Sequence, residues 1–278
     1  MSNESGVPSR ARDVLAATWA RGLVGVAAFL VLAEVLGRSG AISQSVLPLA
    51  STVLARAVGL AGNPRFLGDL AATIEAWAAG LAITVAVAVP CGLVLGSMPG
   101  VRTATHAVVE FLRPIPAVAL IPLVALILGP GLRMNVTLIV YAAIWPVLFN
   151  TIYGVGDVDP VAKETLRAFG FGQLDVVRRV SLPAAAPFIL TGIQMASSIA
   201  IILNIGTGVV TGRIDGNGIG AFIADANASG GNTALVLAAA LWAGVLGLTV
   251  NGLLVWSGRR MLPWHRAYLG EQSLREMR

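Results

Sequence analysis

The side chains that could do covalent or metal chemistry are few in this chain. Lys163 is the only lysine, and its neighbours do not form the Gly-Lys-Ser/Thr sequence of a phosphate-binding loop. The single cysteine, Cys91, and the two histidines, His106 and His265, lack the spacing of metal ligands. We interpret these three as packing or surface residues. The sequence therefore predicts a protein that is not an enzyme, holds no cofactor and relies on a partner for any ATP hydrolysis.

Acidic residues inside apolar segments are equally scarce. Glu34 lies near the outer end of the first apolar segment, and Glu75 lies at the start of the second. A proton relay would need several such groups facing one interior, and the later segments have none. This argues against an ion-coupled secondary transporter and against a membrane-embedded enzyme. We interpret Glu34 as an interfacial or packing group, with a direct transport role as the alternative.

The segment 157–183 is the most informative stretch. Asp159 is suited to cap a helix and Pro160 to occupy its first position. The helix should run to Phe169 and stop at Gly170. A second short helix is predicted over 173–179, ending before Pro183. Spacing along the first helix places one set of apolar side chains on a face and charged ones on the others: Ala162, Leu166 and Phe169, against Lys163, Glu164 and Arg167.

The same segment resembles a family motif. Gly170 follows Glu164 by six residues, and Val180, Leu182 and Pro183 come after a further nine-residue gap. This spacing resembles the EAA motif of ABC-importer permeases, although Thr165 and Leu166 replace its two alanines and Val180 replaces its isoleucine. In that family the segment is the coupling helix that sits in a cleft of the ATPase subunit. The resemblance implies these coupling residues: Lys163, Glu164, Leu166, Arg167, Phe169, Gly170, Leu182 and Pro183.

Further stretches resemble the nitrate/sulfonate/taurine subfamily of these permeases, namely 113–131, 143–155 and 261–264. The resemblance implies a small sulfonate-, taurine- or nitrate-like anion as substrate. It also implies partner ATPase subunits, an extracytoplasmic solute-binding protein and a second permease subunit, most simply in a homodimer. However, 203–208 is similar to osmoprotectant permeases, and 211–213 lacks the acidic residue common in sulfonate-like members. An osmoprotectant or vitamin precursor therefore stays open.

Composition indicates what must position these residues. The chain is 56% hydrophobic and 12% charged, with a mean hydropathy of +0.81, whereas soluble domains carry about 25% charged residues. We predict an all-α polytopic membrane protein, and the resemblance implies the type I ABC-importer permease fold. Six spans are expected, at 19–36, 74–95 (kinked at Pro90), 114–128, 135–153, 184–210 and 233–256.

The basic residues predict the orientation. With the N-terminus inside, 14 of the 19 Lys and Arg residues face the cytoplasm, as the positive-inside rule requires. The net charge of +5 thus indicates contact with membrane lipid, and no nucleic-acid partner is expected. The expected organisation in the inner (plasma) membrane is a cytoplasmic tail at 1–18, a permease domain at 19–257 and a second cytoplasmic tail at 258–278. Outer connections should hold an amphipathic stretch at 46–60 and a short helix at 219–226.

Polar residues in the fifth span are the candidates for the transport path. They are Gln194, Ser197, Ser198, Asn204 and Thr207. The alternative is that such side chains bond to the preceding helical turn or to a neighbouring helix. Pairs of glycines four residues apart, Gly92/Gly96 and Gly208/Gly212, predict close helix approach.

Overall fold

The computed structural model describes residues 10–40, 43–212, 218–230 and 232–261. Helices are the only regular secondary structure in this part of the chain, which confirms the all-α prediction. Arg213, His265 and the tail beyond Met261 lie outside the described residues, as do residues 1–9. The structure therefore does not test the expectations for the two terminal tails.

Five helices are long and apolar enough to cross a membrane. They lie in α1 (Arg10–Arg38), α3 (Pro64–Ser97), α6 (Leu132–Gly156), α9 (Leu182–Thr211) and α11 (Thr233–Met261). A bent pair brings the number to six if it is counted as one span: α4 (Pro99–Leu112) meets η1 and α5 (Ala117–Leu120, Ile121–Leu128) at 73°. The structure is thus compatible with six spans.

The third span differs from its expected form, a single short helix over 114–128. Helix α4 adds 14 residues before it, and the chain breaks between α4 and η1, where Pro114 and Pro116 follow each other closely. Each proline lacks a backbone N–H and disfavours helical geometry in the preceding residue, so the two together interrupt the helix. The second span also starts earlier, because Asn63 caps α3 through hydrogen bonds from the Arg65 and Phe66 N–H groups.

Helices α3, α6 and α9 pack closely, and glycines make this possible. A Cβ on Gly92 would lie 2.6 Å from Thr151 of α6, and one on Gly96 would lie 2.8 Å from Val155. This confirms the close approach predicted for the first glycine pair. In the second pair only Gly208 makes a close approach, since it lies against Gly220 and Ala221. Gly212, with a φ of +64°, ends α9.

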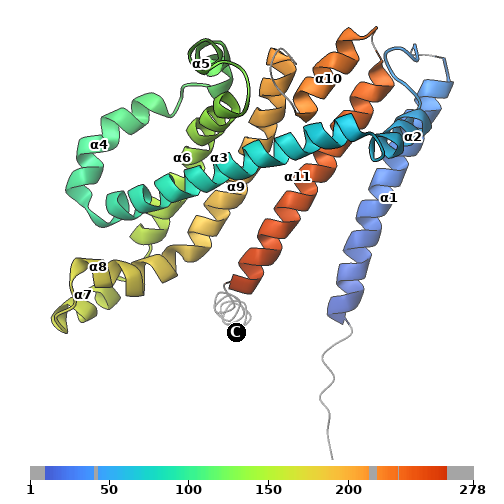
Figure 1. The fold of residues 1–278 in the computed structure, drawn as a ribbon. Helices are drawn as coiled ribbons and strands as arrows, with labels where there is room; N and C mark the ends of the chain where they lie inside the picture. Colours follow the sequence, from blue (N-terminus) through green and yellow to red (C-terminus); the bar gives the residue numbers. More distant parts are fainter. Residues whose placement is uncertain (1–9, 41–42, 213–217, 231, 262–278) are drawn as a thin grey trace, which may run out of the picture.

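The two short helices α2 and α10 lie at the same end of the molecule as α5 (Figure 1). Helix α2 (Ala50–Leu60) confirms the amphipathic stretch, and the Trp242 indole donates to its Ala57 carbonyl at 2.8 Å. Glu34 ties α1 to α2, because its carboxylate pairs with Arg38 and accepts hydrogen bonds from the N–H and hydroxyl of Ser51. These contacts agree with the interpretation of Glu34 as an interfacial or packing group.

Helix α10 (Ile219–Ala228) confirms the short helix expected in the last outer connection. Buried Asp69 and Thr73 of α3 accept hydrogen bonds from the backbone N–H groups of Gly218 and Ile219, at 3.0 and 2.9 Å. Arg65 of α3 pairs with Asp225 at 2.7 Å. Two contacts near its start and one near its end therefore fix α10 on α3.

Candidate coupling segment and transport path

The first helix of the candidate coupling segment is α7 (Pro160–Ala168), and its two ends follow the prediction. Asp159 accepts a hydrogen bond from the Val161 N–H at 2.8 Å. At the other end, the N–H groups of Gly170 and Phe171 donate to the carbonyls of Arg167 and Leu166. Gly170 has a φ of +83°, the left-handed backbone that this helix-terminating motif needs. The chain therefore stops α7 sharply and turns back.

The second helix of the candidate coupling segment does not end before Pro183 as predicted. Helix α8 (Gln173–Val176) leads into a π-helical turn, η2 (Val177–Ser181), which passes directly into α9. The Leu182 N–H donates to the Val177 carbonyl, five residues back. Pro183 cannot donate a backbone hydrogen bond, and its ring would crowd an ordinary α-helical turn. The wider turn lets the helix continue through it, so α8 is joined end to end with a membrane span.

Apolar side chains are exposed at the start of α7 and at the bend between α7 and α8. Val161, Phe169 and Leu174 are 65%, 78% and 71% exposed. The expected apolar face is thus divided: Ala162 and Leu166 are half-buried against the chain itself, whereas Phe169 points outward. We call Val161, Phe169 and Leu174 the exposed knob. Glu164 and Gly170 are exposed beside it, and Leu182 and Pro183 are exposed where α9 begins.

Lys163 links the coupling segment to the membrane helices. Its Nζ donates to the Val155 carbonyl in the last turn of α6 at 2.9 Å, where a cation is favoured by the helix dipole. Burial, and then the nearby positive charge of Arg167, lower the pKa of Lys163 below its usual value. Arg167 itself donates to the Gln173 side chain at 3.2 Å and so joins α7 to α8. Lys163 thus connects α7 to α6, and Arg167 connects α7 to the helix that continues from α8 into α9.

The five polar residues of the fifth span lie in two settings. Ser197, Asn204 and Thr207 are buried: Ser197 accepts from the Trp77 indole at 3.1 Å, Asn204 donates to the Thr73 carbonyl at 2.9 Å, and Thr207 donates within its own helix. These bonds match the packing alternative. Gln194 is half-buried and Ser198 is exposed, and Ser197 and Ser198 line a groove of about 760 Å³ between α9 and α11. The assignment of α9 to the path stays a prediction.

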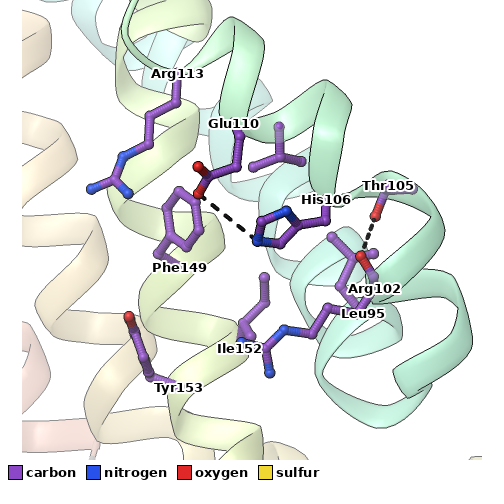
Figure 2. Close-up of a pocket in the computed structure, with 10 residues that line it drawn as sticks. Leu95, Arg102, Thr105, His106, Glu110, Arg113, Phe149, Ile152 and Tyr153 are labelled. Carbon is purple, nitrogen blue, oxygen red and sulfur yellow. Dashed lines mark hydrogen bonds and ion pairs between the residues drawn. The ribbon is translucent and has the colours of Figure 1, made fainter.

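One polar cluster was not anticipated from the sequence. Arg102, His106, Glu110 and Arg113 line a cavity between α4 and α6 (Figure 2). Their spacing of four, four and three residues is the signal that would have found it, because it places all four on one face of a helix. Because 96–113 was expected to connect two spans, no helix was predicted there.

Comparison with known proteins agrees with this architecture. Residues 88–263 match the family described as "Binding-protein-dependent transport system inner membrane component". The chain is 28% identical over 195 residues to the nitrate import permease protein NrtB of Leptolyngbya laminosa, covering 70% of this chain and 68% of the relative. It is 28% identical over 254 residues to the putative aliphatic sulfonates transport permease protein SsuC of Bacillus subtilis, covering 91% and 90%.

One further relative and one solved structure are also similar to this chain. The choline transport system permease protein OpuBD of Bacillus subtilis is 27% identical over 196 residues, covering 70% of this chain and 84% of the relative. Among solved structures, a chain of the MetNI methionine ABC transporter in an inward-facing conformation matches with a TM-score of 0.58 and 20% identity. That match covers 72% of this chain and 97% of the other, and it establishes a shared fold.

Proposed function

The chain belongs to the family of inner-membrane components of binding-protein-dependent transport systems, and on that basis we propose that it conducts a small oxyanion, such as nitrate or a sulfonate, in an ABC importer. The role of a membrane permease follows from membership of this family. The substrate class is supported by the relatives named for nitrate and aliphatic sulfonates. The relative named for choline makes a quaternary ammonium osmolyte the second candidate.

The observation that carries the proposal is the exposed knob at the bend of α7 and α8. Three large apolar side chains are exposed: Val161 near the start of α7, and Phe169 and Leu174 at the sharp bend that follows this helix. A short helix that presents an apolar anchor fits a groove on a partner protein. We place an ATPase subunit there. Two such subunits, two copies of this chain in the membrane and an extracytoplasmic binding protein make up the proposed importer.

In this assembly ATP binding closes the two ATPase subunits and shifts the knob of each permease. The shift reaches α6 through the bond from Lys163 to the Val155 carbonyl, and it reaches α9 through the continuous α8–η2–α9 helix. Both α6 and α9 belong to the packed centre of the chain. The spans would then alternate between inward- and outward-facing arrangements while the binding protein delivers substrate from outside.

The coupling role is tested by Phe169→Asp in the full-length permease, co-expressed with its ATPase subunit. Burying an unpaired carboxylate in the partner's groove is costly, so we expect co-purification of the ATPase to fall by about tenfold or more. The matched control is Val46→Asp, which alters an exposed apolar residue in the connection between α1 and α2. Retention of the ATPase by Phe169→Asp would refute the knob as its docking site.

The substrate class is tested separately by uptake into proteoliposomes that contain the assembled importer and its binding protein. We expect ATP-dependent accumulation of nitrate or methanesulfonate, and none of choline. Accumulation of choline alone would overturn the oxyanion assignment in favour of the second candidate. Accumulation that survives an inactive ATPase but collapses with the ion gradient would contradict an ATP-driven importer.

A further inference from the structure

The unexpected polar cluster lies along one face of α4. None of the residues in α4 is buried. Its charged face carries Arg102, His106 and Glu110 and continues into Arg113, whereas the opposite side exposes Val108 and Phe111. Ionisable groups at the level of a membrane are costly unless they face an interior or a water-filled cavity. The charged face is therefore expected to be turned towards the rest of the protein and away from lipid.

The cavity that this face lines is small, and the His106 and Glu110 side chains that line it are still 68% and 62% exposed. It has a volume of about 210 Å³, roughly that of seven water molecules at ~30 Å³ each. Helix α4 forms one wall, and Phe149 and Tyr153 of α6 form the opposite one. In Figure 2 the side chains of Arg102 and Arg113 extend from the two ends of the charged face towards α6, with His106 and Glu110 between them. A nitrate or a small sulfonate fits this space.

The charges favour an anion. Glu110 lies 3.9 Å from His106, and the Arg113 guanidinium lies 4.6 Å above the ring of Phe149. Within the described ranges, no carboxylate lies within ion-pair distance of Arg102 or Arg113. The cavity thus has one more positive than negative charge when His106 is neutral. Planar guanidinium groups match the geometry of oxyanions and are weakly hydrated, which makes them good partners for such ligands.

The location connects the cavity to the coupling segment. Tyr153 lines the cavity, and two residues later the Val155 carbonyl accepts the hydrogen bond from Lys163 of α7. The cavity therefore lies within one helical turn of the point where α7 is attached to α6. A movement of α7 that shifts the end of α6 would displace one wall of the cavity relative to α4.

We propose that this cavity is an oxyanion-binding site near the cytoplasmic end of the transport path, with Arg102 and Arg113 as the charge partners. The identity of the oxyanion as substrate rests on the proposed function. A phospholipid phosphate has the same chemistry and is the other possible source of the ligand. The apolar side of α4, with Val108 and Phe111, is the surface suited to acyl chains, whereas the charged face is turned towards α6.

The test measures anion binding to the full-length permease with its ATPase subunit in nanodiscs of phosphatidylcholine. Thermal unfolding is followed in sodium nitrate and in sodium methanesulfonate, against sodium chloride at equal ionic strength. We expect a saturable rise in Tm with the first two salts, since a ligand that binds the folded state stabilises it. In Arg102→Gln and Arg113→Gln the half-saturating concentration should rise by about tenfold or more, because each loses a charge-assisted interaction.

Two controls separate specific binding from misfolding. Arg133→Gln removes an exposed arginine at the other end of α6 and should leave the half-saturating concentration unchanged. Arg102→Lys keeps the positive charge and should restore part of the affinity. An unchanged half-saturating concentration in both glutamine variants, with basal ATPase activity retained, would overturn the site.

The remaining outcomes separate this inference from the proposed function. ATP-driven uptake of nitrate or methanesulfonate without any specific rise in Tm would overturn the cavity site alone. A specific rise in Tm without uptake would leave the site standing and count against the proposed substrate. Native mass spectrometry in nanodiscs with anionic lipid provides the lipid arm: loss of bound anionic phospholipid in the glutamine variants, with unaltered anion response, would identify a headgroup site and overturn the substrate assignment.

Discussion

Two glycines in the coupling segment differ in what they do. Gly170 has a φ of +83°, in the left-handed region, whereas Gly172 has a φ of −71°. A Cβ would meet no atom within 4 Å at either position. We expect Gly170→Ala to cost about 1 kcal/mol through backbone strain alone and to shift the knob, lowering transport per ATP hydrolysed. Gly172→Ala is the matched control and should behave as wild type in melting temperature and in uptake; equal behaviour of the two variants would contradict this account.

Lys163 is expected to act through α6 and not through the partner. Lys163→Met keeps the apolar stem but leaves the Val155 carbonyl without its donor. Hydrogen bonds to charged groups contribute roughly 1.5–3 kcal/mol to stability. Because this bond is partly exposed, we expect the variant to lose about 1 kcal/mol of stability. Co-purification of the ATPase should be retained while coupled uptake falls, and Lys163→Arg should restore part of it. Loss of the ATPase itself would show that Lys163 contacts the partner.

The close contact between α3 and α6 depends on glycines, which have no side chain to keep the two helices apart. A Cβ at Gly92 would meet the Cβ of Thr151 at 2.6 Å and the Leu148 carbonyl oxygen at 3.1 Å. Gly92→Ala should therefore destabilise the protein by about 1–3 kcal/mol, as overpacking does. Gly68→Ala in the same helix meets nothing within 4 Å and should be neutral or slightly stabilising, since alanine favours helix. Thermal unfolding in detergent compares the two variants, and equal melting temperatures would rule out a tight contact between α3 and α6.

The anchoring of α10 can be tested at Asp69. Asp69→Ala removes the acceptor for the buried Gly218 N–H, and an unsatisfied buried donor costs about 1–3 kcal/mol. We expect faster hydrogen exchange over 219–228. Arg65→Gln breaks only the surface pair with Asp225, which should cost at most ~1 kcal/mol. The order of exchange rates, Asp69→Ala above Arg65→Gln above wild type, is the expected result; the reverse order would assign the anchoring to the surface pair.

Local signals predicted some elements well and others poorly. Asp159, Pro160 and Gly170 bound α7 because caps and stops depend on a few neighbouring residues. The break at Pro114 and the passage of a helix through Pro183 were mispredicted, since both depend on how neighbouring turns relax around a proline. The setting of Asn204 could not be predicted either, because its partner, the Thr73 carbonyl, is 131 residues away in sequence. Tertiary contacts between spans decide whether a polar side chain packs or faces a path.

At the scale of the whole molecule, the orientation in the membrane follows from where the ends of the helices lie. The start of α1, the α7–α8 bend and the end of α11 lie on one side in Figure 1, while α2, α5 and α10 lie on the other. The excess of basic residues predicts that the first side faces the cytoplasm. The two sides can be distinguished by labelling single cysteines, once the exposed Cys91 has been replaced by serine.

Asp157→Cys at the end of α6 and Asn227→Cys in α10 are both at exposed positions, but on opposite sides of the molecule. In intact cells a membrane-impermeant maleimide should label Asn227→Cys and spare Asp157→Cys. Permeabilised cells should label both, which controls for the reactivity of each thiol. The reverse pattern would place α7 outside, where no ATP is supplied, and would remove the physical basis for coupling through the knob. Agreement would place the coupling segment and the mouth of the α4–α6 cavity on the side where ATP is hydrolysed and substrate is released.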